Sequence, residues 1–426
     1  MTVVTGGRKA SGLEWVGSIP AHWAAPPLGA KFEIQLGKML SPASASGYEL
    51  RPYLRNVNVQ WDRLDLDDVA EMSFDTADRL RYALRPGDLL VCEGGEVGRA
   101  ALWNGDLVDC YYQKALHRVR PYRRDSTRFL MYALMAAAHL GVFENEGNTS
   151  TFVHLTAEKL RAHRFPWPPT EEQRAIADYL DAETARTDAI VRARREQHGL
   201  LDQREFAMLS QTLVPPSVPM SRLRFMASIQ SGLTVDAQRD GGSDAVTRPY
   251  LRVANVHADE LVLDSVTEIT VPRTLAERCT LLYGDVLMTE GGDLDKLGRG
   301  TMWRGELPGA LHQNHVFAVR PHPGMLDPEY LALLTRTLHA RSYFERTGSK
   351  TTGLASTSSE KIGGLPVPAL GLEAQAELVA EVTARVEQMR SFRSRLSHQI
   401  DLLLERRQAL ITAAVTGQLE IPVAAA

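Results

Sequence analysis

The stretch RPYLRNVNV at residues 51–59 returns almost unchanged as RPYLRVANV at residues 248–256. At the same spacing, the Gly-Asp and Glu-Gly-Gly motifs within residues 87–95 return within residues 284–292. After a short insertion in the second copy the correspondence resumes, and both copies end at a Pro-x-Pro motif. Matching motifs in the same order over so long a stretch predict two copies of one folding unit.

Length and composition agree with a protein of several folding units. The chain has 426 residues, which exceeds an ordinary single domain of roughly 100–200 residues. Hydrophobic residues make up 44% and charged residues 23%, a mixture typical of globular proteins rather than disordered chains. The formal net charge of −4 excludes a uniformly basic nucleic-acid coat protein, although local basic patches remain compatible with it.

Neither a membrane span nor a disulfide framework is predicted. The apolar runs are much shorter than the ~20 residues that a spanning helix needs, and the N-terminus lacks the apolar core of a signal peptide. We therefore expect a cytoplasmic protein. Cys92, Cys110 and Cys279 form no C-x-x-C pair, so we interpret them as buried thiols and predict no metal site.

Each copy leads into a long helix. Thr170 and Gln173 form a capping-box pattern, and no proline follows until residue 215. The second helix begins near Glu373 and runs without proline to Gly417, a residue typical of helix ends. Each helix would be about 45 residues or ~65 Å long at ~1.5 Å per residue.

Apolar spacing favours packing of these helices as a coiled coil. Alternate three- and four-residue steps through the second helix meet eight apolar side chains among eleven positions: Leu378, Val382, Arg385, Met389, Phe392, Leu396, Gln399, Leu403, Arg406, Leu410 and Ala413. The equivalent series in the first helix, which includes Ile176, Leu180 and Ile190, is less apolar. Two separate amphipathic helices lying on their own domains remain the alternative.

The remaining sequence predicts a repeated α+β domain. Short apolar segments bounded by glycine, such as residues 88–92 and 285–289, indicate strands, and helical periodicity is confined to short stretches. We predict five parts in order: a first globular domain, a central long helix, a linker with a second globular domain, a distal long helix and a tail, at residues 1–168, 169–214, 215–368, 369–417 and 418–426.

No motif for catalysis is present. The sequence lacks a G-x-x-x-x-G-K-[ST] phosphate loop, a G-x-G-x-x-G fingerprint, H-E-x-x-H and G-x-S-x-G. Glu93 and Glu290 precede Gly-Gly pairs at the ends of apolar strands, and we interpret them as parts of structural turns with no partner base. We predict no catalytic residue, and a methyltransferase acting alone is not supported.

Two similar but diverged domains on a spacer suit the reading of two different DNA half-sites. Side chains able to contact base edges occur in loops of both copies. Our candidates are Asn58, Arg99, Gln113, Lys114, Asn148, Thr149, Asn255, Lys296, Arg299, Gln313, Asn314, Lys350 and Thr351.

Structural roles remain open for several of these candidates. Asn58 and Asn255 would equally cap turns, and Arg99 and Arg299 would equally form internal ion pairs. A local basic cluster, suited to phosphates or to a solvated face, comprises Arg118, Arg120, Tyr122, Arg123 and Arg124.

Three segments resemble the specificity subunit of type I restriction-modification systems: SGLEWVGSIPAHW at residues 11–23, PPTEEQ at 168–173 and ERRQALITAAVTG at 405–417. The resemblance implies two target recognition domains and two antiparallel spacer helices, with no catalytic activity in this subunit. Ala374 departs from the pattern at the start of the second helix, where the first helix has Glu172, so the capping of the second helix is less certain.

The same resemblance implies partners and cofactors. The partners would be double-stranded DNA, two modification subunits and restriction subunits. No cofactor is expected on this chain, because S-adenosylmethionine for adenine-N6 methylation belongs to the modification subunits, and ATP and Mg to the restriction subunits. The alternative function is a non-catalytic coiled-coil scaffold whose repeated domains bind proteins or glycans, which the net negative charge favours.

Overall fold

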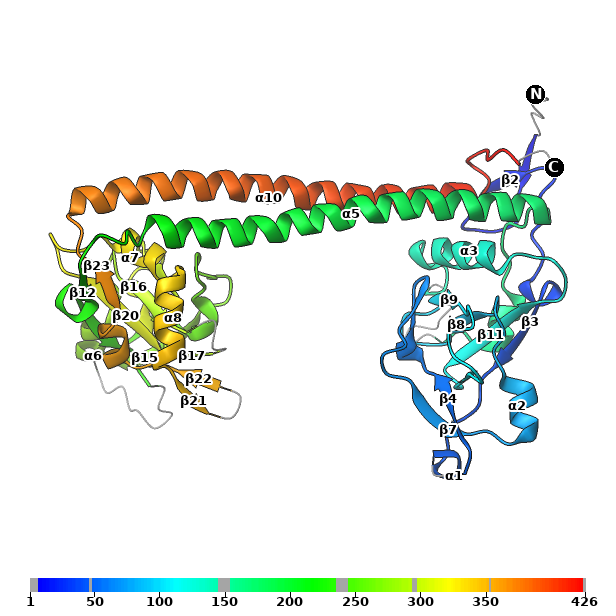
Figure 1. The fold of residues 1–426 in the computed structure, drawn as a ribbon, viewed down its shortest axis with the longest axis horizontal. Helices are drawn as coiled ribbons and strands as arrows, with labels where there is room; N and C mark the ends of the chain where they lie inside the picture. The colour runs from blue at the N-terminus through cyan, green and yellow to red at the C-terminus, as the bar shows by residue number, and fades with distance from the viewer. Residues whose placement is uncertain are drawn as a thin grey trace. The chain divides into compact units, whose positions relative to one another are not determined.

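The computed structural model describes residues 7–45, 48–144, 154–234, 244–292, 297–351 and 354–423. Internal contacts divide the chain into unit 1, residues 1–193 with 399–426, and unit 2, residues 194–398. Each unit contains one globular domain and one half of each long helix, α5 (Thr170–Thr212) and α10 (Leu372–Val415) (Figure 1).

The two long helices are antiparallel, as the family resemblance implies. In unit 1, Asp188 of α5 forms an ion pair of 3.1 Å with Arg407 of α10. In unit 2, Asp202 of α5 lies 3.4 Å from Arg393 of α10. Residue numbers rise along one helix as they fall along the other, which confirms the antiparallel coiled coil. The apolar residues buried with these helices are Ile176, Leu180, Ile411, Ala414 and Val415 in unit 1, and Leu209, Leu213, Val382 and Val386 in unit 2.

The predicted seam of α10 is wrong at four of its eleven positions, because Arg385, Phe392, Gln399 and Arg406 are exposed. Val191 and Val386 are buried where Ile190 and Arg385 were expected, and Phe392 is 43% exposed. Arg393 and Arg407 occupy the seam instead, because each forms an ion pair with an aspartate of the facing helix. Counting apolar residues alone cannot detect such paired charges.

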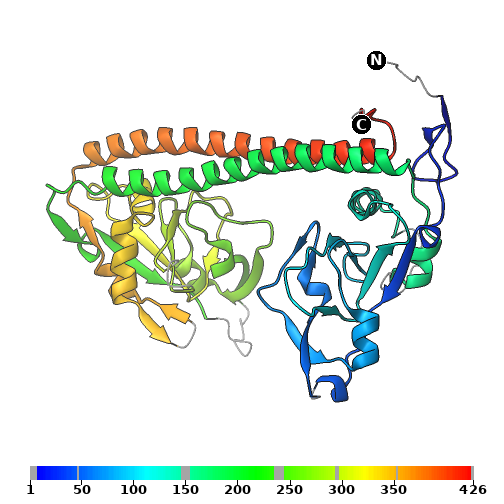
Figure 2. The ribbon, with the colours of Figure 1, turned by 45° about the vertical axis from the view of Figure 1, so that its right-hand side comes forward.

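In unit 1 the domain contains two small sheets. The antiparallel four-stranded sheet has the order β3-β11-β8-β9, with bounds Phe32–Leu36, Leu116–Pro121, Leu89–Cys92 and Ala100–Leu102. The three-stranded sheet has the order β10-β4-β7, with bounds Tyr111–Tyr112, Leu50–Leu54 and Ala70–Ser73. Helix α3 (Thr127–His139) lies between the four-stranded sheet and α5 (Figures 1 and 2).

The domain in unit 2 repeats this topology. Its four-stranded sheet has the order β13-β20-β16-β18, with bounds Ala227–Ser231, Val316–Pro321, Val286–Thr289 and Gly300–Met302. Its three-stranded sheet has the order β19-β14-β15, with bounds Leu311–His312, Ala245–Leu251 and Thr267–Pro272. In the smaller sheet of each unit one pair of neighbouring strands is parallel, β10 with β4 in unit 1 and β19 with β14 in unit 2. This shared topology confirms the duplicated α+β fold.

Smaller elements surround these sheets. In unit 1 they are β1 (Arg8–Ala10), β2 (Ser18–Pro20), η1 (Leu28–Ala30), α1 (Pro42–Ala45), η2 (Asn56–Asn58), β5 (Val59–Gln60), β6 (Arg63–Leu64), α2 (Thr76–Tyr82) and α4 (Ala157–Ala162). In unit 2 they are β12 (Met220–Arg222), η3 (Leu223–Phe225), η4 (Val253–Asn255), α6 (Arg273–Cys279), β17 (Gly291–Gly292), α7 (Pro328–Leu334), α8 (Leu338–Thr347), β21 (Ser349–Thr351), β22 (Leu354–Ser356), α9 (Ser359–Gly363) and β23 (Pro366–Pro368).

Both long helices begin in the same way, although the sequence suggested a less typical start for α10. The Gln173 side chain accepts a hydrogen bond from the Ser126 backbone N–H at 2.8 Å and donates to the Pro168 carbonyl at 2.9 Å. Gln375 accepts from the Asp327 N–H and donates to the Leu370 carbonyl, both at 2.8 Å. The buried glutamine is therefore sufficient to anchor each helix, and Glu172 is not needed for that contact.

Glu172 has a different role in unit 1. Its carboxylate accepts hydrogen bonds from the His22 Nε2 at 2.7 Å and from the Trp23 indole N–H at 2.6 Å. The N-terminal segment is held further by Arg8, which donates to the Gly417 carbonyl at 2.5 Å. Two of the segments that carry the family resemblance thus contact each other.

The three cysteines are buried free thiols, as predicted. Burial raises the pKa of the Cys110 thiol to about 12 and also raises the pKa of Cys92, so both favour the protonated form. Among the described helices, none has a stretch long and apolar enough to cross a membrane.

Candidate nucleic-acid interface

Three loops meet beside β8 in unit 1. The Glu93 backbone N–H donates to the Ala115 carbonyl at 3.0 Å, which links the Glu-Gly-Gly loop to the Gln113–Lys114 loop. The Leu155 N–H donates to the Glu93 carbonyl at 2.8 Å, which brings in the segment that follows residue 153. The backbone of one glutamate therefore joins three connections that are remote in sequence.

Unit 2 repeats this junction with the same backbone atoms. The Glu290 N–H donates to the His315 carbonyl at 2.8 Å, and the Thr357 N–H donates to the Glu290 carbonyl at 2.7 Å. Glu93 and Glu290 thus have the structural role that their recurrence predicts. The expectation that neither has a partner base is wrong for Glu290, because its carboxylate lies 2.5 Å from the His315 Nδ1.

Gln113 and Gln313 are held at the centre of these junctions by their backbones. Gln113 donates its N–H to the Leu54 carbonyl at 2.9 Å, and Gln313 donates to the Leu251 carbonyl at 2.8 Å. Gly37 passes so close that an added Cβ would lie 2.4 Å from the Gln113 carbonyl oxygen, so this contact requires glycine. Each glutamine side chain is half-buried at the surface of a rigid loop.

The residues after these glutamines differ between the units. Lys114 is exposed in unit 1, whereas its counterpart Asn314 is half-buried in unit 2. Asn314 lies 3.3 Å from the Nε2 of His315, a residue that the sequence candidates did not include. The Glu290 carboxylate contacts Nδ1 of His315, so Nε2 points away from that carboxylate. The sequence signals that could have pointed to His315 were the recurrence of Glu290 as Glu93 and the presence of a histidine directly after the candidate Asn314.

Asn58 and Asn255 have the structural role that the sequence left open. Each is 2% exposed and closes a 3-10 turn by accepting a hydrogen bond of 2.8 Å from the backbone N–H of Arg55 or Arg252. The Asn58 amide also donates to the Asp65 and Asp68 carbonyls at 2.9 Å. These asparagines shape the loop, and we assign no base contact to them.

The two candidate arginines are half-buried beside the junctions. Arg99 donates to the Asn56 side-chain oxygen at 2.8 Å and lies 3.4 Å from Glu96, the internal contact that was the alternative to base reading. The Asn56 amide in turn donates to the Gly94 carbonyl at 2.8 Å, so Arg99 supports the Glu-Gly-Gly loop from behind. Arg299 lines a cleft in unit 2 with Arg336 and other residues.

The remaining candidates are placed only in part. Asn148, Thr149 and Lys296 lie outside the described residues. Lys350 and Thr351 belong to strand β21, which pairs with β22, and β22 in turn pairs with β17 of the Glu-Gly-Gly loop. The hairpin that contains these two residues is therefore part of the same junction in unit 2.

The predicted basic cluster in unit 1 is divided. Arg118 is buried and donates to the Arg81 carbonyl at 2.9 Å and to the Gln35 side chain at 2.7 Å. Arg120 forms a two-fold hydrogen-bonded ion pair with buried Asp88, at 2.6 Å for both bonds, which raises the pKa of Arg120. Arg118 is buried and Arg120 is partly exposed, and both have partners within the domain, so they do not belong to the solvated face that was one of the two interpretations of the cluster.

Comparison with known proteins finds similar proteins over most of the chain. Residues 58–197 match the family model of the type I restriction modification DNA specificity domain. The specificity subunit of the type I restriction enzyme EcoKI from Escherichia coli (strain K12) is 21% identical, over 95% of this chain and 90% of that protein. The StySPI specificity subunit from Salmonella potsdam is also 21% identical, over the same shares of the two chains.

Solved structures show the same fold along most of the chain. A chain in a structure of a type I R-M system, described in terms of complex assembly and conformational transition, has a TM-score of 0.71 at 16% identity, covering 94% of this chain and 99% of that chain. The HsdS subunit from Thermoanaerobacter tengcongensis has a TM-score of 0.55 at 16% identity, covering 94% and 98%. With the duplicated domains and the paired helices, these matches make the chain similar to type I restriction-modification specificity subunits over most of its length.

Proposed function

We propose that this chain is the DNA-recognition subunit of a type I restriction-modification complex, and that its two domains read the two halves of an asymmetric site. The observation that carries the proposal is that the two domains share a backbone framework but differ in the side chains that would contact bases. Glu93 and Glu290 hold equivalent loops, yet Lys114 and Ala115 of unit 1 correspond to Asn314 and His315 of unit 2. A family whose role is specificity explains why the side chains of these loops differ while their backbones match.

The chemistry of the loops suits direct readout of bases. Gln113 and Gln313 each present an amide, which can bond the N6 and N7 edge of adenine. Lys114 is a cation that would favour the acceptors of guanine, whereas Asn314 and His315 offer both donor and acceptor atoms. Because the loops are fixed by backbone bonds, little conformational entropy would be lost when they bind.

The long helices carry a second duplicated feature that supports docking of two modification subunits. When the helices are aligned on Gln173 and Gln375, four exposed residues are identical and spaced to lie on one helix face: Gln197, Leu200, Arg204 and Ala207 in α5, and Gln399, Leu402, Arg406 and Ala409 in α10. Leu200 is 55% and Leu402 is 49% exposed. Identical exposed side chains on two helices suit two copies of one partner.

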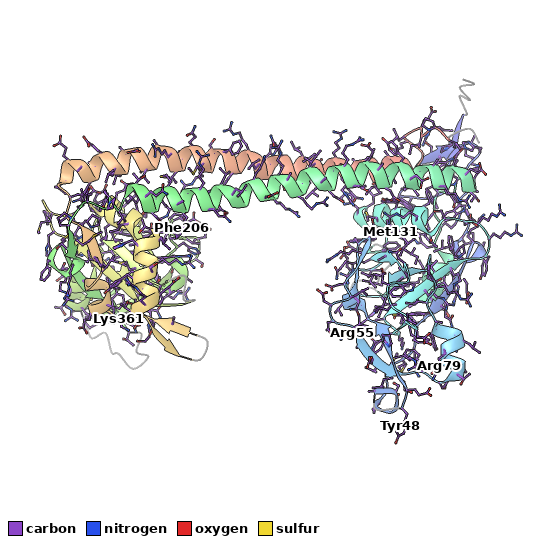
Figure 3. The ribbon with its side chains drawn as sticks, in the orientation of Figure 1. Tyr48, Arg55, Arg79, Met131, Phe206 and Lys361 are labelled. Atoms are coloured by element: carbon purple, nitrogen blue, oxygen red, sulfur yellow. The ribbon has the colours of Figure 1, made fainter. Side chains whose placement is uncertain are left out.

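We call these two sets of four residues the helix stripes, and each stripe faces away from the globular domain of its own unit. In unit 2, Arg204 comes one residue before the buried Glu205, whereas Phe206 comes one residue after it and lines the cleft against the domain. Figure 3 labels Phe206 on the domain side of α5. Successive residues are about 100° apart around a helix, so Arg204 and Phe206 point to opposite sides. In unit 1, Arg406 and Gln408 flank Arg407 in the same way, with Gln408 lining a pocket beside Met135 of α3.

The proposal assigns the chemistry to other subunits. The specificity subunit is the non-catalytic component of its family. S-adenosylmethionine would be bound by the modification subunits for methylation of adenine N6, and ATP with Mg by the restriction subunits. The helix pair would set the distance between the two half-sites, because α5 and α10 each contribute to both units.

Mapping of methylated adenines tests this function. A host that expresses this chain with its modification subunit should carry N6-methyladenine at one asymmetric sequence made of two short parts with a fixed gap. The purified complex should bind a duplex with that sequence, and its affinity should fall steeply with salt. Methylation that is unchanged by deletion of this chain, or binding to proteins or glycans without affinity for DNA, would favour the scaffold function.

A further inference from the structure

In each unit, two arginines occupy equivalent positions in the domain. In unit 1 they come from the later of two facing segments, and in unit 2 they come from the earlier one. In unit 1, Gly29 of η1 faces Arg161 of α4, and a Cβ added to Gly29 would lie 3.2 Å from the Arg161 Cβ. In unit 2 the order is reversed. Arg224 of η3 faces Gly363 of α9, and a Cβ added to Gly363 would lie 3.3 Å from the Arg224 Cβ. The glycine makes room for an arginine from the opposite segment in both cases.

The same exchange occurs at the neighbouring position. Pro27 pairs with Arg164 across an antiparallel bridge in unit 1. The equivalent pair in unit 2 is Arg222 with Pro366, in the register of β12 and β23. Proline and arginine have changed places between the two segments. The number of cations is the same in both units, and the bridge is kept.

A lysine completes both groups. The Thr156 hydroxyl accepts the Lys159 backbone N–H at the start of α4, and the Ser358 hydroxyl accepts the Lys361 N–H at the start of α9. The recurring Glu158 and Glu360 lie in the first turns of these helices, where the helix dipole stabilises acidic side chains. We name as cationic edge 1 the residues Lys159, Arg161 and Arg164, and as cationic edge 2 the residues Arg222, Arg224 and Lys361.

These six side chains are available to a ligand. All except the half-buried Lys361 are exposed, and within the described part of the chain none of the six has a carboxylate at ion-pair distance. Backbone oxygens orient two of them, because Arg161 donates to the Ile34 carbonyl at 2.5 Å and Arg164 to the Ala25 carbonyl at 2.7 Å. Phe225, which follows Arg224, is 63% exposed. Figure 3 labels Lys361 on the part of unit 2 that lies away from α5.

Each cationic edge adjoins the loop junction of its own domain. In unit 1, Leu155 binds the Glu93 carbonyl and Lys159 follows four residues later in the chain. In unit 2, Thr357 binds the Glu290 carbonyl, Lys361 again follows four residues later, and its ammonium donates to the Ser349 hydroxyl of β21 at 2.6 Å. Within each domain, the loops that differ in side chains therefore lie next to an edge that keeps its charge.

We propose that cationic edges 1 and 2 bind the phosphodiester backbone of DNA beside the two half-sites. This inference rests on the proposed function. Base edges change with sequence and phosphates do not, so a reader that has diverged should keep its phosphate contacts and vary its base contacts. Exchange of arginine with glycine and with proline preserves the charge of the edge while the surrounding sequence changes. Acidic protein surfaces lack the regular spacing of phosphates and are tested as the alternative below.

The test is the salt dependence of DNA binding by the complex with its modification subunit. The variant Arg222→Ala/Arg224→Ala/Lys361→Ala removes edge 2, and Arg273→Ala/Arg278→Ala/Arg304→Ala removes the same charge from other exposed positions of unit 2. Three lost phosphate contacts should reduce the slope of log affinity against log salt by about 2 to 3. The decrease in slope should be the same for duplexes that contain the methylated sequence and for duplexes that lack it. The sequence that the complex methylates should stay unchanged.

Several outcomes would overturn the proposal. They are a slope equal to that of the wild type or of the control, a change in the methylated sequence, or loss of the modification subunit from the complex, which would indicate a protein partner. The conservative variant Arg222→Lys/Arg224→Lys should restore the slope, which separates loss of charge from misfolding. If the wild-type complex itself shows no salt-dependent DNA binding, the proposed function fails instead.

Discussion

Unit 1 and unit 2 fasten their domains to the long helices with one shared contact and different charges. Gln173 and Gln375 make the same hydrogen bonds to backbone groups of their domains. The ion pairs differ, because unit 1 uses Arg128 of α3, which binds Asp181 of α5 at 2.7 Å. Unit 2 uses Glu205 of α5, which contacts Arg336 of the domain.

The difference shows which contacts survive duplication. A glutamine that binds backbone atoms does not depend on the identity of a partner side chain, so it can stay while its surroundings change. A buried charge needs a partner, but that partner can come from another element. The same rule describes the cationic edges, where the charge is kept and its source is exchanged.

The largest expected effect comes from replacing one reader. If residues 221–368 are exchanged for the corresponding domain of another specificity subunit, we expect one half of the methylated sequence to change completely and the other half to remain. The change is confined because each domain has its own core and its own loop junction. Methylated-adenine sequencing of the chimaera measures this, and a change in both half-sites would refute independent reading.

The second-largest effect is expected from the two helix stripes, which should bind modification subunits independently of each other. Leu200→Glu or Leu402→Glu places a charge in one proposed docking surface, so each variant should bind one modification subunit fewer and the double variant should bind none. Native mass spectrometry of the purified complex gives the count. Leu404→Glu is the matched control, because this residue is also exposed but lies outside the stripe. Loss of both subunits from either single variant would contradict two separate surfaces.

A repeated buried ion pair tests whether the two frameworks are equally stable. Asp88 and Asp285 each bind an arginine through two hydrogen bonds, Arg120 at 2.6 Å and Arg320 at 2.7 and 2.8 Å. Asp88→Asn or Asp285→Asn leaves the arginine without its counter-charge. Since the arginines are partly exposed, we expect a loss of about 2–4 kcal/mol in the free energy of unfolding in each case. Denaturant titration of both variants, with the exposed Asp106→Asn as control, would reveal any difference between the two units in the loss of unfolding free energy.

Buried histidines provide the smallest effect. Burial lowers the pKa of His117 in unit 1 and of His312 in unit 2. The unfolded chain therefore binds protons first, so stability is complete above the unfolded pKa of about 6.5 and falls as the pH drops toward the lowered values. The loss is at most about 1.4 kcal/mol per pH unit for each histidine.

Histidine variants isolate this effect from general acid sensitivity. His117→Gln or His312→Gln should flatten the dependence of unfolding free energy on pH between about 6.5 and 5, because glutamine does not titrate. His139→Gln replaces an exposed histidine and serves as the control substitution. Equal curves for the wild type and the buried-site variants would mean that these histidines become protonated in the folded protein.

The sequence predicted the duplication and the α+β domains because each leaves a repeated or periodic pattern, and apolar spacing favoured the coiled coil. The antiparallel direction of the helices was implied by the family resemblance. The sequence-based prediction missed two seam positions, because Arg393 and Arg407 lie there through ion pairs with the facing helix. It also grouped Arg118 and Arg120 with exposed neighbours, because alternation along a strand does not reveal which polar side chain has an internal partner. His315 was not among the candidates because its partner Glu290 is 25 residues away in the sequence.

The cationic edges show a further limit of reading motifs one position at a time. Arg161 has a glycine as its counterpart in the second copy, and Arg224 has a glycine in the first, so neither stands out when the repeats are aligned. Their equivalence becomes apparent only where the two segments face each other across the domain. Exchanges of this kind are visible in space and hidden in sequence.

The most direct test of the account is a change in the length of the spacer. Four residues inserted at matched positions in α5 and α10 add one helical turn, or ~6 Å, to the helix pair. We predict that methylated-adenine sequencing will find both half-sites unchanged and the gap between them longer by one or two base pairs, since the rise is ~3.4 Å per base pair. An active complex with an unchanged gap, or with altered half-sites, would contradict the claim that two independent readers are held apart by this pair of helices.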